Sequence, residues 1–183
     1  MEQASEQFGK LFTDKEFADV ELECDGEVFH CHQLILSARS DVFRAMFQND
    51  MKESRSKKVA IEDVDPKVLG EMLHYIYTGL TNKDLLEEKA RDLLSAANRY
   101  QLGLLKNICE DQLCSALNLS NCIKHLIFGD LYQASKLRRM SLVKIARNMT
   151  KLVATEDYEN LVKNHPVLAT EIPAAMVEVM TKK

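Results

Sequence analysis

Apolar and polar positions near the N-terminus first follow a helical period and then a strand period. Phe8 and Leu11 lie on one stripe of an otherwise polar segment, with Ala4 one turn earlier, which predicts a short amphipathic helix. Strict alternation then begins, and Asp25-Gly26 is a typical turn pair within it. The pattern therefore predicts a two-stranded hairpin over 20–31.

Helical periodicity returns after the hairpin. Two short helices are predicted over 33–47, where Ser40-Asp41 interrupts the apolar pattern and can cap the second helix. A charged loop at 49–58 and a short strand at 59–61 follow. The next helix is predicted over 65–79, and the sequence marks both of its ends. It begins with an Asp-Pro pair and ends at a glycine.

The rest of the chain has helical spacing of its apolar residues throughout, with short connections that favour antiparallel helix pairs. We predict a mixed α/β first domain, 1–118, and an all-helical extension, 119–183, in which Ser120 can cap the first helix. The expected fold class is α+β. The apolar segments that mark the individual helices lie at 93–97, 102–113, 123–131, 142–149, 158–162 and 167–180.

The composition is that of a folded domain and narrows the range of partners. Of the 183 residues, 46% are hydrophobic and 28% are charged, and the net charge is -4. An acidic protein binds phosphate backbones poorly, so we expect no nucleic-acid partner. Without a long apolar run or a secretory leader, we expect no membrane partner. The five cysteines lack the spacing of a disulfide framework, which indicates free thiols and a location in the nucleus, the cytoplasm or both.

Side chains that could carry catalysis or bind a metal are scattered. His30, Cys31 and His32 are consecutive, but alternation along a strand would put the two histidines on one face and the cysteine on the other. A strand end is favoured over a metal site, and we expect no metal, no cofactor and no catalytic residue. One later segment is rich in basic residues and is interpreted as a solvated helix face. Its basic residues are Lys136, Arg138, Arg139, Lys144, Arg147 and Lys151.

Four segments of the first half are weak motifs singly and specific in combination. They are Phe17-Ala18-Asp19-Val20, the run from Phe29 to Ser40, the run from Val42 to Phe47, and Tyr75-Ile76-Tyr77-Thr78-Gly79. Together they resemble the BTB/POZ domain. The resemblance implies a fold in which helices surround a small, mostly three-stranded sheet, and a protein-interaction module rather than an enzyme.

Further segments at 93–100, 109–114, 130–134 and 164–166 extend the similarity over nearly the whole chain. They resemble the speckle-type POZ protein group, in which a 3-box and a shortened BACK region would correspond to 119–183. Proteins of that group carry a substrate-binding MATH domain before the BTB domain, and this sequence has none. We therefore expect ubiquitination substrates to be bound through a region absent from this chain.

The resemblance also implies a homodimer. Carried over to this sequence, the dimer interface falls on Ala4, Phe8 and Leu11, with Ile35 opposite. The apolar stripe of the first helix agrees for Phe8 and Leu11, because a partner subunit could cover it. Packing of that stripe onto its own domain stays open as the alternative.

The resemblance further implies docking to the scaffold protein cullin-3, through a hydrophobic residue, any residue and then glutamate. Here this tripeptide is Met51-Lys52-Glu53. The implied function is a substrate adaptor of a cullin-3-RING E3 ubiquitin ligase, with no catalysis of its own. The alternative is a dimerisation module of a transcriptional regulator that recruits corepressors. The cullin-binding residues expected from the resemblance are Met51, Glu53, Phe47, Tyr77, Leu126 and Leu131.

Overall fold

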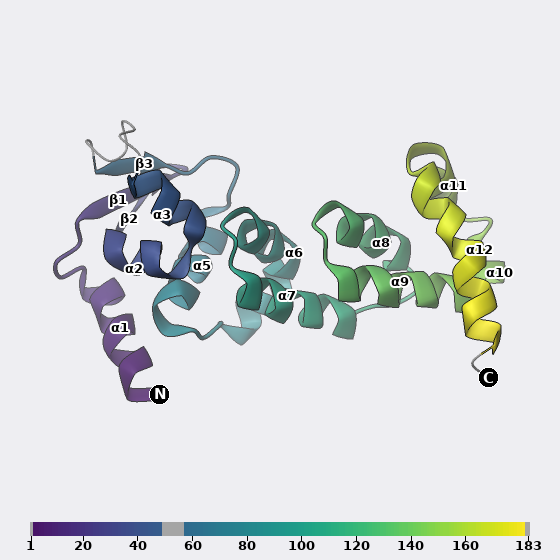
Figure 1. The fold of residues 1–183 in the computed structure, drawn as a ribbon, viewed down its shortest axis with the longest axis horizontal. Coiled ribbons are helices and arrows are strands. Elements are labelled where there is room, and N and C mark those ends of the chain that lie inside the picture. The colour runs from purple at the N-terminus through teal and green to yellow at the C-terminus, as the bar shows by residue number, and fades with distance from the viewer. Residues whose placement is uncertain (1, 49–56, 182–183) are drawn as a thin grey trace. The chain divides into compact units, whose positions relative to one another are not determined.

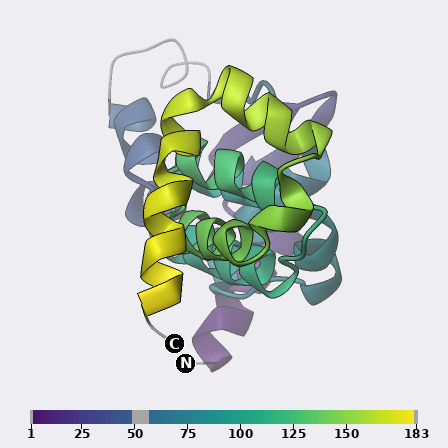
Figure 2. The same ribbon diagram turned by 90° about the vertical axis from the view of Figure 1, so that its right-hand side faces the viewer.

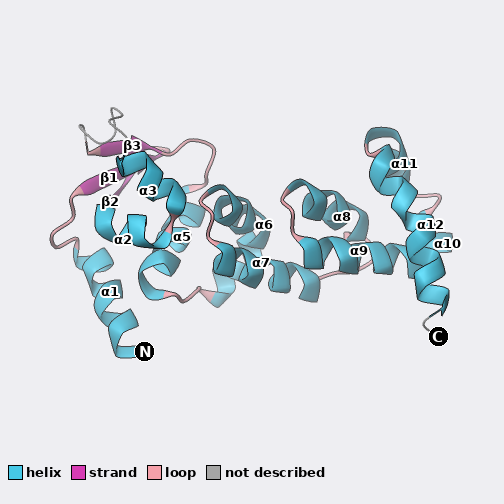
Figure 3. Cartoon of the chain, viewed as in Figure 1, coloured by secondary structure: helices cyan, strands magenta, loops and turns pink. Residues whose placement is uncertain are grey.

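The computed structural model describes residues 2–48 and 57–181 and divides into two compact units, Met1–Cys109 and Glu110–Lys183 (Figure 1). All strands among the described residues lie in the first unit (Figure 3). The predicted α+β class and the helical end of the chain are confirmed. The first unit contains α1 (Glu2–Asp14), β1 (Val20–Cys24), β2 (Glu27–Cys31), α2 (Gln33–Arg39), α3 (Asp41–Gln48), β3 (Lys58–Ala60), α5 (Pro66–Thr78) and α6 (Lys83–Arg99), and α7 (Gly103–Ser115) spans the division.

The three strands form one small sheet in the order β2-β1-β3. β1 pairs antiparallel with β2, with Leu22 opposite Phe29, and parallel with β3, with Leu22 opposite Val59. Leu22 and Val59 are buried, so the centre of the sheet faces the core. The turn between β1 and β2 has positive φ at Asp25 (49°) and Gly26 (81°), as both central residues of a type I′ turn do. The predicted hairpin is confirmed.

The capping residues that the sequence indicated for α3 and α5 are found at the ends of these helices. The Ser40 hydroxyl accepts a hydrogen bond from Phe43 N (3.2 Å) and donates one to the Tyr100 carbonyl oxygen (2.7 Å). It therefore caps α3 and ties this helix to the end of α6. The Asp65 side chain accepts a backbone hydrogen bond at the start of α5, and Gly79 ends that helix with a φ of 73°.

Helix α6 is longer than the apolar pattern predicts. It begins before the predicted segment because Asn82 caps it, accepting a hydrogen bond from Leu85 N at 3.1 Å. Leu86 and Ala90 are buried and extend the apolar stripe toward the N-terminus. Lys89 lies between these two residues and has non-helical backbone angles (φ -119°, ψ 20°), so the helix is kinked at this point.

The second unit is a set of helices around a core of its own. Its helices are α8 (Cys122–Leu131), α9 (Ser135–Arg147), α10 (Met149–Leu152), α11 (Glu156–Asn164) and α12 (Pro166–Thr181). α9 packs against both α8 and α12 (Figure 2). A Cβ on Gly129 of α8 would lie 2.9 Å from the Arg138 backbone nitrogen, so α8 and α9 approach more closely than an alanine allows. The core consists of Cys122, Ile123, Leu126, Ile145, Leu152, Leu161, Leu168 and Ile172.

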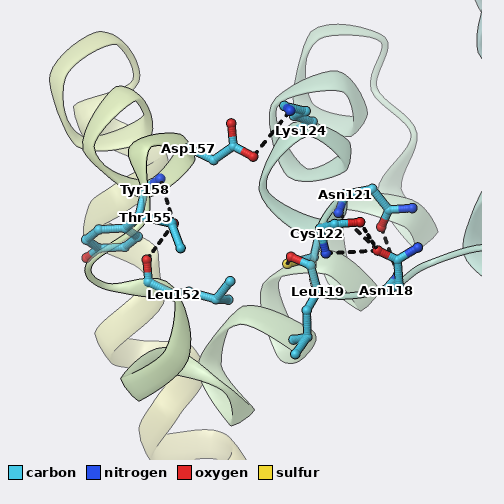
Figure 4. Close-up of polar contacts among 10 residues, drawn as sticks. Asn118, Leu119, Asn121, Cys122, Lys124, Leu152, Thr155, Asp157 and Tyr158 are labelled. Atoms are coloured by element: carbon cyan, nitrogen blue, oxygen red, sulfur yellow. Dashed lines mark hydrogen bonds and ion pairs between the residues drawn. The ribbon is translucent and has the colours of Figure 1, made fainter.

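A polar turn leads into α8 (Figure 4). The Asn118 side-chain oxygen accepts hydrogen bonds from Ser120 N (2.9 Å) and Asn121 N (3.2 Å), so Asn118 organises the turn. The cap predicted at Ser120 is wrong, because the Ser120 hydroxyl donates to Asn118 (2.6 Å) and Asn121 precedes the helix without a side-chain cap. Figure 4 also shows the ion pair of Lys124 with Asp157 (3.3 Å), which joins α8 to α11.

The predicted domain boundary after residue 118 lies in this turn, whereas the two compact units divide between residues 109 and 110. The assignment of 119–183 as a domain of its own stays a prediction. None of the described helices is long and apolar enough to cross a membrane. Within 2–48 and 57–181, no cluster of three or more His, Cys, Asp or Glu side chains could hold a metal ion.

Candidate functional site

One stripe of α1 packs against α5 of the same unit. The Ser5 hydroxyl donates a hydrogen bond to the Thr78 carbonyl oxygen at 2.6 Å. A Cβ on Gly9 would lie 3.2 Å from the Thr78 methyl group, so the two helices are close at this point. The Phe12 ring stacks on Tyr77, with 4.9 Å between the ring centroids. Residues 5, 9 and 12 therefore fix α1 on its own unit.

A second stripe of α1, offset by one residue, remains more open. It contains Phe8, which is 45% exposed, and Leu11, which is half-buried. Ala4 belongs to this stripe by its position in the helix. Each residue advances an α-helix by about 100°, so this stripe faces a different direction from the one that packs on α5. Ile35 lies on α2, which also packs against α5, and is half-buried.

Buried Tyr77 connects α5 with α2 and with the segment that follows α1. Its hydroxyl oxygen accepts a hydrogen bond from His32 N (2.9 Å) and lies 2.8 Å from His32 Nδ1. His32 Nε2 is 2.6 Å from the Glu16 carbonyl oxygen, which can only accept. In the neutral ring, Nε2 therefore carries the hydrogen and Nδ1 accepts from the Tyr77 hydroxyl. We call Tyr77, His32 and the Glu16 carbonyl the Tyr77 node.

Burial keeps the Tyr77 hydroxyl and the neighbouring Cys31 thiol uncharged. It raises the pKa of the Tyr77 hydroxyl above its usual value and raises the pKa of the neighbouring Cys31 thiol to about 12. Both groups stay protonated at neutral pH, and a buried thiol with a raised pKa is a poor nucleophile. All five cysteines are free and buried. The node is thus a structural contact rather than a reactive centre.

The run from His30 to His32 departs from the alternation expected of a strand. β2 ends at Cys31, so His32 begins the turn into α2 and approaches Tyr77 instead of sharing the surroundings of His30. His30 lies 4.0 Å from Glu21 on the neighbouring strand. The two histidines therefore have different partners, because the strand ends one residue before the pattern does.

The predicted docking tripeptide follows α3, whose position depends on a row of aromatic rings. Phe47 stacks on Phe43 with 6.0 Å between centroids, and Phe43 stacks on Tyr100 at 4.7 Å. Phe43 is fully buried and Phe47 is half-buried, so the row reaches the surface at Phe47. Met51 and Glu53 lie outside the described residues.

Two of the residues expected to contact a cullin are core residues. Leu126 has no exposed surface and belongs to the apolar core of the second unit, and Tyr77 is 5% exposed. Such burial favours a supporting position over a direct contact for these two residues, and their contacts with a cullin stay predictions. Leu131, at the end of α8, is 70% exposed and is available to a partner.

A family model of the BTB/POZ domain matches residues 8–117, more than half of the chain. The chain belongs to the BTB/POZ domain family. BTB/POZ domains are protein-interaction modules that typically dimerise and are generally non-enzymatic. The apolar stripe of α1 lies inside the matched region from Phe8 onward, so the BTB/POZ match and the open surface coincide.

Two curated relatives share this BTB/POZ region. The chain is 37% identical over 172 residues to protein maternal effect lethal 26 of Caenorhabditis elegans, covering 93% of this chain and 43% of the relative. It is 37% identical over 164 residues to TD and POZ domain-containing protein 5 of Mus musculus, covering 90% of this chain and 48% of the relative. The chain thus spans less than half the length of each of these relatives.

A solved structure also resembles the BTB/POZ region. The BTB domain of zebrafish PATZ1 matches with a TM-score of 0.51 and 25% sequence identity, covering 60% of this chain and 87% of that chain. The fold implied by the four sequence motifs of the first half is therefore confirmed.

Sequence reasoning found one stripe of α1 in this BTB/POZ domain and missed the other. Ser5 and Gly9 are not apolar, so a search for apolar spacing passes over them. Small residues four positions apart in an amphipathic helix are the signal that could have located this close packing. The partners on α5 are more than sixty residues away, and no local pattern identifies them.

Proposed function

We propose that this BTB/POZ chain is a homodimeric, non-catalytic adaptor of a cullin-3-RING E3 ubiquitin ligase. In this proposal 119–183 is a 3-box with a partial BACK region of the speckle-type group, and substrates bind through a region outside the chain. The observation that carries the proposal is the open apolar stripe with Phe8 and Leu11, on a helix that its other stripe holds in position. The proposed location is the nucleus, the cytoplasm or both, which the five free cysteines support.

The dimer part of the proposal rests on the fixed orientation of α1. Because Ser5 and Phe12 already anchor the helix on α5, the stripe with Phe8 and Leu11 is pre-organised for a partner. A twofold dimer would bring the same stripe of both subunits together, with Ile35 opposite, and would bury apolar surface without moving the helix. Two substrate sites in one particle would then raise the effective concentration of the ligase at its substrate.

The test of the dimer is the double substitution Phe8→Asp with Leu11→Asp. Burying two carboxylates from each subunit in a twofold interface is strongly unfavourable, so this variant is expected to sediment as a monomer. The matched control is Gln3→Asp with Gln7→Asp, which adds the same two charges to exposed positions of α1 and is expected to remain a dimer. A Phe8/Leu11 variant that still sediments at twice the chain mass would contradict the proposed interface.

The cullin-3 part of the proposal rests on the resemblance to the speckle-type group at Met51 and Glu53. An apolar side chain on a polar loop can anchor in a partner's groove, and a carboxylate can accept hydrogen bonds from it. Half-buried Phe47 in the first unit and exposed Leu131 in the second are the other residues that this proposal assigns to cullin-3 binding.

Calorimetry with the purified N-terminal domain of cullin-3 tests this docking. We expect Met51→Ala with Glu53→Lys to abolish binding while the variant still dimerises, and Lys52→Ala, at the unspecified position of the tripeptide, to bind as the parent does. Undiminished cullin-3 affinity in the double variant would refute the docking assignment. A parent chain that dimerises, ignores cullin-3 and binds a corepressor peptide at its dimer groove would support the transcriptional alternative.

A further inference from the structure

A groove runs between α9 and α12 in the second unit, and the proposed function does not use it. It consists of a hollow of about 580 Å³ and an adjacent hollow of about 450 Å³. The two hollows share Val143, Arg147 and Glu178 as lining residues, so they lie next to each other. We call the two together the α9–α12 groove.

Apolar side chains line much of the α9–α12 groove. Met140 and Val143 come from α9, and Met176 and Val179 come from α12. Met140 is 38% exposed, so this apolar surface is open to solvent. Methionine side chains are flexible and polarisable and adapt to the shape of a bound apolar residue.

Basic residues on α9 also line the groove, and two of them differ from Arg138 of the same basic segment in their pairing. Arg139 and Arg147 make no ion pair with any described residue. By contrast, Arg138 on the same helix pairs with Asp130 and Glu171. The basic segment is therefore divided: part of it forms ion pairs within the second unit, and part of it lines the groove without an ion pair to any residue that the structure describes.

The charge of the groove is predominantly positive. Lys144 lines it as well, and its Nζ donates a hydrogen bond at 3.1 Å to the carbonyl oxygen of Leu117, which lies just after α7. Glu178 is the acidic residue among the described residues that line the groove. Residues 139 and 147 are eight positions apart, which corresponds to about 12 Å along α9, or about two helical turns.

We infer that the α9–α12 groove binds an acidic amphipathic helix of a partner protein. The apolar face of such a helix covers the methionine and valine side chains, and its carboxylates pair with the guanidinium groups of Arg139 and Arg147. The spacing of these two arginines matches acidic residues about two turns apart on the incoming helix. Charge complementarity favours an acidic helix over a neutral or basic helix, since a neutral or basic helix would offer no carboxylate to the two guanidinium groups.

The experiment uses the full chain and a fluorescein-labelled synthetic peptide of about 18 residues, with leucines on one helical face and glutamates on the flanking positions. A scrambled peptide of the same composition, whose leucines share no face, is the control probe. We expect the ordered peptide to bind and its Kd to rise with added salt, because screening weakens the carboxylate–guanidinium attraction. The scrambled peptide is expected to bind at least tenfold more weakly.

The variant that tests the groove is Arg139→Glu with Arg147→Glu. Both side chains are exposed, so the fold is expected to persist, and the Kd of the ordered peptide is expected to rise at least tenfold. Lys151→Glu with Lys163→Glu makes the same charge change at exposed positions away from the groove and is expected to leave the Kd unchanged.

Methyl NMR of methionine-labelled protein locates the bound peptide independently of these variants. The signals of Met140 and Met176 are expected to shift on binding, and that of Met72, which is buried in the first unit, is expected to stay. Equal binding of the scrambled peptide, equal binding by the folded Arg139/Arg147 variant, or shifts only outside the groove would each overturn the inference. So would self-association of the parent chain that the arginine reversals abolish, since a second copy would then fill the groove.

Discussion

The two units of the chain are held by polar contacts of different kinds. In the first unit, His32 and Tyr77 are 45 residues apart and their hydrogen bonds are buried. In the second unit, Arg138 bonds to Glu171 through an ion pair that is about a third exposed, and α8 packs against the helix that directly follows it. The Tyr77 node therefore joins distant segments of the first unit through buried hydrogen bonds, whereas the ion pairs of Arg138 join helices of the second unit near its surface.

This difference predicts different sensitivities to substitution. Removing one partner of a buried hydrogen bond leaves the other without water or protein to replace it, which costs about 1–3 kcal/mol per group. Breaking an exposed ion pair costs about 0–1 kcal/mol, because both charges return to water. Polar substitutions should therefore weaken the first unit most, and changes of side-chain volume should weaken the second.

The largest effect is expected for Tyr77→Phe. The substitution removes a hydroxyl that serves both His32 N and His32 Nδ1, so two buried groups lose their partner. We expect the free energy of unfolding of the first unit to fall by about 3 kcal/mol. Hydrogen exchange followed by mass spectrometry can measure this loss for peptides of α5 separately from those of the second unit.

Tyr75→Phe is the matched control for this prediction. Tyr75 lies on the same helix and is as buried as Tyr77, but its hydroxyl makes no hydrogen bond with a described residue. We expect its removal to change the free energy of unfolding by less than about 0.5 kcal/mol. Equal effects of the two substitutions would mean that the Tyr77 node adds nothing beyond the burial of an aromatic ring.

The Tyr77 node also shows which structural features can be predicted from the sequence and which cannot. The helix that carries Tyr77 was predicted with both its ends, because Asp65, Pro66 and Gly79 are local signals that act within a few residues. The burial of Tyr77 was not predicted, since its partner His32 is brought to it by the path of the whole hairpin. Local chemistry determines where elements begin and end, and contacts between distant elements determine which of their residues remain at the surface.

The next largest effect is expected for Gly129→Ala in the second unit. The new Cβ would lie 2.9 Å from the Arg138 backbone nitrogen, which cannot move without shifting α9. Alanine favours the helix by about 1 kcal/mol, but overpacking costs up to about 3 kcal/mol, so we expect a net loss of about 2 kcal/mol. Hydrogen exchange of peptides from α8 and α9 should report this loss, with little change in the first unit.

Gly103→Ala is the control for the close approach at Gly129. Gly103 begins α7, and a Cβ there would meet no atom within 4 Å. This substitution is expected to be neutral or slightly stabilising, because only helix propensity changes. If Gly129→Ala proved as harmless as Gly103→Ala, α8 and α9 would have room to separate, and the tight packing of successive helices would not distinguish the second unit.

The candidate interaction surfaces were predictable to different degrees. Phe8 and Leu11 form an apolar stripe that the sequence alone indicates, and the structure leaves Phe8 partly exposed. The α9–α12 groove was not foreseen, because Arg139 and Met176 are contributed by helices separated by two others in the chain. The basic segment around Arg139 was interpreted as a uniformly solvated face. The structure instead divides it between ion pairs within the unit and arginines on the groove that pair with no described residue.

The smallest effect is expected for Arg138→Met, although Arg138 has two acidic partners. Its Nη2 lies 2.6 Å from Glu171 Oε1 and its Nε lies 2.9 Å from Asp130 Oδ1, but all three side chains are partly exposed. We expect a loss of about 1 kcal/mol, measured by urea denaturation, that becomes smaller in 1 M salt as screening replaces the lost pairs. The control Arg44→Met breaks one exposed pair with Asp41 within α3 and an exposed hydrogen bond to the Ser37 carbonyl oxygen, and is expected to cost about 0.4 kcal/mol. A salt-independent loss of about 3 kcal/mol or more at Arg138 would mean that buried polar contacts stabilise both units alike.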